Sequence, residues 1–245
     1  YFDDVEFEMN KREFITHVGT YKGKRVTVIS TGIGTDNVEI FLTELDALAN
    51  IDLKTREPKS RKKKLKIIRI GTSGALQEDI PVGSHLVTDY AVGLDNLMSF
   101  YDLKQDAFER EIGDDLQKEI NLPVKPYVVR GSELIRKHLA TDMITGNTIT
   151  TPGFYAPQGR ELRIAPRYPK LLDDLNCYHN KATDFWLTNF EMETAAYYAL
   201  GRLLGHEVVS VNAIIANRIK NKFSKDPNKV VDSLIKKVLD KIEVL

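Results

Sequence analysis

Residues 189–196 read Asn189-Phe190-Glu191-Met192-Glu193-Thr194-Ala195-Ala196, and an apolar helix-forming run continues to Leu200. A short apolar lead-in, two carboxylates and a helical run predict a strand that ends where a helix begins. In open α/β sheets this junction faces the ligand crevice. A carboxylate there can accept hydrogen bonds from sugar hydroxyls, and Met192 can pack on the apolar face of a sugar. A simpler interpretation is that Glu191 and Glu193 only favour the positive end of the helix.

A second strand-to-helix junction lies in the N-terminal part of the chain. Residues 25–30 predict a strand that pairs in a hairpin with a strand over residues 12–21. The loop Thr31-Gly32-Ile33-Gly34 follows, residues 35–37 offer helix caps, and apolar residues then repeat on one helical face over residues 38–48. This order of strand, glycine loop and helix presents backbone N–H groups to an anion, although such loops are common turns.

An arginine interrupts the apolar strand predicted for Ile67-Ile68-Arg69-Ile70-Gly71-Thr72-Ser73-Gly74-Ala75. A charged side chain inside a buried strand is costly unless an anion pairs with it. Beside hydroxyls and glycines, the natural anion is phosphate, which suits the planar fork of a guanidinium. The alternative is a buried ion pair between Arg69 and one of the acidic residues.

A long segment over residues 147–167 carries three prolines and two glycines, and we expect it to be irregular. It contains Phe154-Tyr155-Ala156-Pro157-Gln158-Gly159-Arg160. Phe154 can stack on a heterocycle, Gln158 can donate and accept hydrogen bonds, and Arg160 can donate twice. These three residues are a candidate set for binding a base, and the alternative is a surface loop with incidental polar residues.

The remaining pattern indicates an α/β protein. Further strands are predicted over residues 85–92, 127–130 and 208–215, and further helices over residues 103–120, 132–139 and 226–242. The basic stretch from Lys54 to Lys66 has no interleaved aromatic residue, so we expect a solvated loop.

Composition limits the class of protein. The chain has 245 residues, 42% of them hydrophobic, and its 35 basic and 35 acidic residues give a net charge of +0. This balance argues against a general nucleic-acid-binding protein. The only cysteine, Cys177, excludes an intrachain disulfide, and no apolar run approaches the roughly 20 residues that span a bilayer. We therefore expect a cytoplasmic protein with no membrane partner.

Residues 30–34, 69–74, 154–160 and 191–193, in this order and spacing, resemble the nucleoside phosphorylase superfamily and, within it, the uridine phosphorylases. Glu191-Met192-Glu193 and Arg69-Ile70-Gly71-Thr72 match motifs of the superfamily. Phe154-Tyr155-x-x-Gln158-x-Arg160 matches the uridine branch, and the resemblance covers nearly the whole chain. It implies a single α/β domain over residues 1–245, in which helices surround a central, mixed and partly barrel-like β-sheet.

The resemblance also implies a role for each matching residue. The residues that would bind phosphate are Arg12, Arg69, Thr72 and Gly34, with Arg12 lent to a neighbouring subunit. The residues that would bind ribose are Glu191, Met192 and Glu193, and those that would bind the base are Phe154, Gln158, Arg160 and Arg218. Catalysis would rest on Arg69, Arg160, Gln158 and Glu193.

The reaction that the resemblance implies is reversible phosphorolysis of uridine to uracil and ribose 1-phosphate, with inorganic phosphate as co-substrate and no cofactor. Cleavage of the glycosidic bond builds positive charge on the ribose and negative charge on the uracil. Phosphate fixed by Arg69 and Arg12 would attack the sugar carbon, while Gln158 and Arg160 stabilise the charge on the uracil oxygens. Asn217 stands where related purine phosphorylases carry an Asp, which favours a pyrimidine because an amide cannot act as an acid.

Two alternative functions remain open at this stage. A hydrolytic nucleosidase that acts on a purine thionucleoside would use water and would not need Arg69 and Arg12 as a phosphate clamp. A catalytically silent nucleoside-binding protein would bind uridine without turning it over.

Some features of the family lie outside the motifs. The family's Gly-x-Pro-x-Arg phosphate loop and its upstream ribose-binding His do not occur in the chain, and we expect them to precede Tyr1 in the full protein. A lent Arg12 requires a homo-oligomer, at least a dimer, and some family members are hexamers. Some relatives bind potassium at the dimer interface, and Glu13 and Ile33 match two of their ligands. Potassium is therefore a candidate ion, although Asn37 stands near the position of their Ser.

Overall fold

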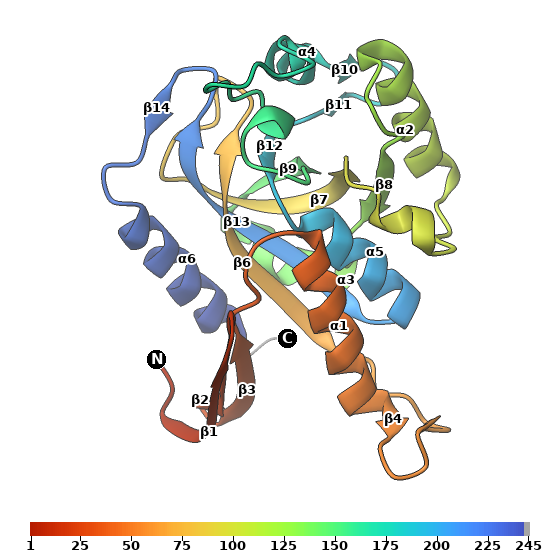
Figure 1. Cartoon of the computed structure of the whole chain (residues 1–245). Coiled ribbons are helices and arrows are strands. Elements are labelled where there is room, and N and C mark those ends of the chain that lie inside the picture. The colour runs from red at the N-terminus through yellow and green to blue at the C-terminus, as the bar shows by residue number, and fades with distance from the viewer. Residues whose placement is uncertain (243–245) are drawn as a thin grey trace.

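A five-stranded mixed barrel lies at the centre of residues 1–242, the part of the chain that the computed structural model describes (Figure 1). The barrel strands are β6 (Lys66–Ala75), β7 (His85–Gly93), β9 (Ile144–Thr150), β12 (Asn189–Glu191) and β13 (Glu207–Asn217). Around the ring, β13 pairs with β6, β6 with β12, β12 with β9, β9 with β7, and β7 with β13. The last pairing closes the sheet, so these strands leave no open edge between them.

The barrel is mixed because its pairings run in both directions. The β13–β6, β12–β9 and β7–β9 pairs are parallel, whereas β12–β6 and β13–β7 are antiparallel. Two strands extend the sheet beyond the ring, namely β8 (Tyr127–Arg130) on β7 and β14 (Lys222–Phe223) on β13. The fold class implied by the resemblance, a central and partly barrel-like mixed sheet, is thereby confirmed.

Helices cover the outside of the barrel (Figure 1). They are α1 (Thr35–Asn50), α2 (Ala107–Ile120), α3 (Glu133–Leu139), α4 (Leu171–Cys177), α5 (Thr194–Leu204) and α6 (Pro227–Lys241), with short 3₁₀ turns η1 (Leu97–Phe100), η2 (Ala140–Asp142) and η3 (Ala156–Gln158). The apolar stripe of α6 packs Leu234 and Val238 against Val209 and Val211 of β13. Within residues 1–242, no helix combines the length and the apolar character needed to cross a membrane.

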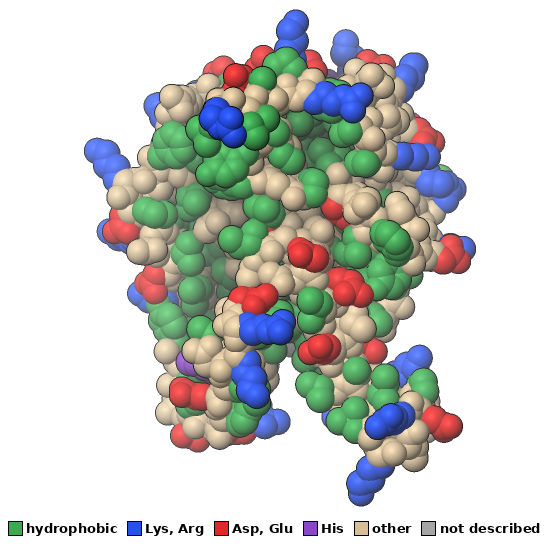
Figure 2. Space-filling model, viewed as in Figure 1, with side chains coloured by type: hydrophobic (Ala, Val, Ile, Leu, Met, Phe, Trp, Pro, Cys, Tyr) green, Lys and Arg blue, Asp and Glu red, His purple; other side chains and the backbone are tan. Residues whose placement is uncertain are grey.

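Two small antiparallel sheets project from the barrel and form separate lobes at the bottom of Figures 1 and 2. One contains β1 (Asp4–Lys11), β2 (Phe14–Tyr21) and β3 (Lys24–Ile29). The other contains β4 (Ile51–Asp52) and β5 (Glu57–Pro58), and we call residues 51–64 the basic arm. A third pair, β10 (His179–Asn180) and β11 (Phe185–Trp186), lies near α2 and α4 at the top.

The structure confirms most expected elements and corrects several. The predicted hairpin gains a third strand, β1, and the segment over residues 147–167 begins inside strand β9. The helix expected from residue 103 begins at Ala107, after the capping residue Asp106. The residue before α1 is Gly34, and none of residues 35–37 caps that helix. The sequence therefore predicted the position of the helix correctly, but not its capping residue.

Candidate functional site

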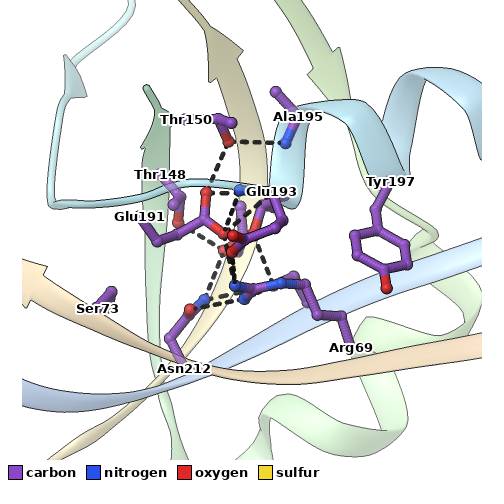
Figure 3. Close-up of polar contacts among 12 residues, drawn as sticks. Arg69, Ser73, Thr148, Thr150, Glu191, Glu193, Ala195, Tyr197 and Asn212 are labelled. Carbon is purple, nitrogen blue, oxygen red and sulfur yellow. Dashed lines mark hydrogen bonds and ion pairs between the residues drawn. The ribbon is translucent and has the colours of Figure 1, made fainter. Parts of the chain in front are cut away.

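Arg69 lies inside the barrel wall and contacts both glutamates of the 189–196 stretch (Figure 3). Its Nη2 is 2.6 Å from an oxygen of Glu193 and 2.8 Å from an oxygen of Glu191. Its Nη1 donates to Ser210 Oγ at 3.2 Å and to Asn212 Oδ1 at 3.1 Å. The buried ion pair, which was the alternative for this arginine, is therefore present, and the phosphate role stays a prediction.

Glu191 closes the N-terminus of α5. Its carboxylate accepts hydrogen bonds from the backbone N–H groups of Glu193 and Thr194 and from the hydroxyl of Thr150. With Arg69 as a fourth partner, both oxygens are committed to the protein. For Glu191, the interpretation that a carboxylate stabilises the positive end of a helix is confirmed, because these donors are the unpaired N–H groups of that end.

Glu193 lies between Arg69 and the glycine loop. The N–H of Gly34 donates to Glu193 Oε1 at 2.8 Å, so the loop binds an anionic group of the protein itself. Gly34 has φ 100°, a conformation that favours glycine, and this aims its N–H at the carboxylate. Burial raises the pKa of Glu193, and the nearby charge of Glu191 adds to this, while Arg69 opposes it. The Glu193 carboxylate thus has fewer protein partners than the Glu191 carboxylate.

Two other residues predicted to bind ribose and phosphate are at least partly accessible to solvent. Met192 is half-buried and Thr72 is exposed, although Thr72 belongs to the same strand as Arg69. Their side chains are therefore available to a ligand, and their binding roles stay predictions.

A second cluster brings together three residues of the 154–160 motif. Arg160 donates to the side-chain oxygen of Gln158 and to the carbonyl of Phe154, and its guanidinium lies 3.8 Å from the centre of the Phe154 ring. Gly159 has φ 65°, and this left-handed turn lets Arg160 fold back over the residues before it. Gln158 is buried and donates to Thr151 Oγ1 at 3.0 Å.

Arg218 joins the second cluster from the loop after β13. Burial lowers the pKa of Arg160 to about 10, and the positive charge of Arg218 contributes to this shift. Burial also lowers the pKa of Arg218, and its Nη1 is buried without a hydrogen-bond partner among the described residues. Across the part of the chain that the structure describes, neither arginine forms an ion pair with a carboxylate. A donor-rich cluster of this kind suits a ligand that carries acceptor oxygens.

Thr151 connects the two clusters. Its N–H and hydroxyl contact the carbonyl of Glu191 at 3.0 and 3.3 Å, and its hydroxyl oxygen accepts from Gln158. On the other side, a Cβ on Gly74 of β6 would lie 3.3 Å from Arg218 Cγ. The glutamate cluster and the Arg160–Arg218 cluster are therefore parts of one site at the end of the barrel strands.

The Asn217 side chain is bonded to the main chain, which argues against its use as a base-selecting residue. Its amide nitrogen donates to the carbonyls of Gln77 and Ile80, and its oxygen accepts from the N–H of Lys220. Every hydrogen bond of this buried side chain goes to the main chain, so Asn217 holds a loop in place.

Arg12 and the residues matched to the potassium site lie beside the glycine loop. Arg12 is exposed in the β1–β2 turn, with φ 56°, and Glu13 Cγ lies 3.0 Å from the position of a Cβ on Gly32. The carbonyl of Ile33 accepts from the amide of Asn37 at 3.0 Å, which satisfies this carbonyl without a cation. Asn37 thus argues against a potassium ion here, and both the ion and the lending of Arg12 stay predictions.

Several residues of the site were missed in the sequence. Thr150 holds Glu191, and Ser210 and Asn212 hold Arg69. The signal for the last two was a Ser and an Asn at alternate positions of an otherwise apolar strand, which places both on one face.

Comparison with known proteins extends these observations. The model of the family described as "Phosphorylase superfamily" matches residues 1–241. The chain is 30% identical over 219 residues to a protein of Thermococcus kodakarensis named uridine phosphorylase, covering 87% of this chain and 66% of that protein. It is 27% identical over 209 residues to a purine nucleoside phosphorylase of the DeoD type from Streptococcus suis, covering 83% of this chain and 68% of the relative.

The fold also matches a solved structure. A nucleoside phosphorylase of Trypanosoma brucei, described as showing uridine phosphorylase activity, superposes with a TM-score of 0.89 at 28% identity. The match covers 100% of this chain and 88% of that one. With the family match extending over almost the whole chain, we conclude that the protein belongs to the phosphorylase superfamily.

Proposed function

We propose that the protein catalyses the phosphorolysis of uridine to uracil and ribose 1-phosphate. The observation that carries this proposal is the cluster of Phe154, Gln158, Arg160 and Arg218, in which two guanidinium groups lie near each other and neither pairs with a carboxylate of the described residues. Uracil offers two carbonyl oxygens to these donors and one N–H to the oxygen of Gln158. Relatives named uridine phosphorylase and the Trypanosoma brucei structure support the same substrate.

The proposed reaction needs no covalent intermediate with the protein. A phosphate oxygen attacks C1′ of the ribose, the bond from C1′ to N1 breaks, and its electron pair goes to the uracil. Arg160 and Arg218 then stabilise the negative charge on the uracil oxygens, which is preorganised electrostatic catalysis. Glu193 accepts hydrogen bonds from the ribose hydroxyls, and Arg69 holds the phosphate near C1′.

The same chemistry on a purine nucleoside is the second candidate. Purine nucleoside phosphorylases of the DeoD type match the chain at 27% identity, and Asn217 is committed to the main chain and so does not decide the base. The Gln158–Arg160 pair favours a pyrimidine. The N–H donors of the pair match the two carbonyl oxygens of uracil, and the oxygen of Gln158 matches the uracil N–H.

The test is the release of free base from uridine and from inosine by the full-length protein, each with and without phosphate. We expect uracil release that depends on phosphate and little cleavage of inosine. Faster cleavage of inosine would replace uridine with a purine substrate. Release that needs no phosphate would identify a hydrolase, and tight uridine binding without release would identify a binding protein.

A further inference from the structure

Each strand of the barrel contributes a polar side chain to its interior, and these side chains form one connected chain of hydrogen bonds. We call Asn212, Thr88, Thr148, Asn189 and Ser73 the lumen chain; they come from β13, β7, β9, β12 and β6, and all are buried. The links measure 3.4 Å from Asn212 to Thr88, 2.6 Å to Thr148, 3.0 Å to Asn189 and 2.9 Å to Ser73. The chain begins at Arg69, whose Nη1 is 3.1 Å from Asn212 Oδ1 (Figure 3).

The direction of each link follows from the amides at the two ends of the lumen chain. A guanidinium only donates, so the atom of Asn212 that faces Arg69 is its oxygen, and its NH₂ group faces Thr88. Thr148 donates its single hydrogen to the oxygen of Asn189, so the hydrogen between Thr88 and Thr148 comes from Thr88. The Asn189 NH₂ group donates to Ser73. A change at any link leaves a donor or an acceptor unsatisfied further along.

A polar barrel interior is costly, because apolar residues of similar shape would need no partners there. The outer face of β13 shows the contrast, since Val209 and Val211 pack against α6 while Ser210 and Asn212 alternate with them and contact Arg69. The first residue of the lumen chain, Asn212, contacts Arg69 of the site. This arrangement indicates a role in orienting that arginine.

We propose that the lumen chain positions the Arg69 guanidinium for phosphate, an inference that rests on the proposed phosphorolysis. The glutamates hold Nη2 while Asn212 and Ser210 hold Nη1, so the plane of the guanidinium is fixed from two sides. A planar fork binds phosphate strongly only in the right orientation. Thr88, Thr148, Asn189 and Asn212 are therefore positioning residues that touch neither substrate.

The test compares Thr148→Val with Thr148→Ser. Valine keeps the shape and removes the hydroxyl, whereas serine keeps the hydroxyl and removes a methyl group. In Thr148→Val we expect the KM for phosphate to rise about tenfold, as one buried hydrogen-bond defect allows, with the KM for uridine nearly unchanged. We expect Thr148→Ser to restore the phosphate KM. Asn212→Leu, at the first link, is expected to raise it at least as much.

Other outcomes would overturn the inference. Equal effects of valine and serine, or changes in both KM values that simply follow the loss of thermal stability, would assign these residues to folding alone. If the unmodified protein shows no phosphate-dependent release of base, the proposed function fails, and phosphate binding is then measured by the rise in melting temperature. If phosphate raises the melting temperature of the unmodified protein and of Thr148→Ser, but not of Thr148→Val, the result supports the inference. No rise in the unmodified protein overturns it.

Discussion

Arg160 and Arg218 form a half-buried pair of like charges, and the energetic cost of this pair indicates what the site is built to receive. The positive charge of Arg218 acts on Arg160, and burial lowers the pKa of both. Bringing positive groups together without a carboxylate is unfavourable until a ligand brings acceptor oxygens or negative charge. The leaving uracil supplies both as the glycosidic bond breaks.

Replacing Arg160 with alanine tests, at the scale of one residue, whether this side chain stabilises the leaving uracil. We expect turnover of uridine to fall by on the order of 100-fold, the usual effect of removing one donor that stabilises developing charge. Steady-state kinetics measures it, and Arg163→Ala, an exposed arginine of the same segment, serves as the control. Unchanged uridine kinetics in Arg160→Ala would contradict the assignment of the base pocket.

Glu193 predicts how the reaction depends on pH. Because burial raises its pKa, Glu193 takes up a proton at a higher pH than an exposed glutamate does. The protonated form no longer pairs with Arg69, so we expect kcat/KM to fall as the pH drops through this raised pKa. A pH profile of the unmodified protein should show this acidic limb, and Glu193→Gln should lack it at a lower overall rate. An acidic limb that persists in Glu193→Gln would assign it to another group.

At the scale of the element, the β12–α5 junction depends on Glu191. Its carboxylate contacts Arg69, Thr150 and the N-terminus of α5. Glu191→Ala leaves Arg69 with one carboxylate fewer and the helix end unpaired, so we expect a loss of about 3 kcal/mol in the free energy of unfolding. Denaturant unfolding measures the loss.

The control for this substitution is Glu78→Ala, which changes an exposed glutamate and should alter the stability by less than about 0.5 kcal/mol. Similar losses in both variants would show that Glu191 is not the anchor of the junction.

Strand and helix types were predictable where a single pattern dominated. The apolar run of β13 and the stripe of α6 were recognised because each is continuous. Strand β9 was missed because Thr148 and Thr150 carry polar groups that only the barrel interior and the site satisfy. The motif residues came together as expected, whereas the choice between ion pair and phosphate at Arg69 depended on Glu191 and Glu193, more than 100 positions away. Tertiary contacts of this kind leave no local pattern.

At the scale of the whole molecule, Arg12 predicts that one subunit completes the site of another. It is exposed in a turn of the projecting β1–β3 sheet, beside the glycine loop. We expect Arg12→Ala and Arg160→Ala each to be nearly inactive alone. In an equal mixture that exchanges subunits, about a quarter of the sites should combine a lent Arg12 with an intact base pocket, given random pairing in a twofold dimer. Activity assays of the mixture measure the recovery, and no recovery after proven exchange would contradict the lending of Arg12.

The basic arm has a consequence for proteolysis. Residues 52–64 are exposed, and Asn50 holds the base of the arm through hydrogen bonds with Lys59 and Lys63. Trypsin cleaves after lysine and arginine. Brief digestion should cut first at Lys54 or Arg56, because both lie in the tip of the basic arm, beyond the residues that Asn50 holds. We expect two fragments on a denaturing gel that still elute together from a sizing column, because Val38 and Leu42 of α1, before the cut, pack against α5, after it. A nicked protein that keeps its full activity would show that the arm is separate from the catalytic site.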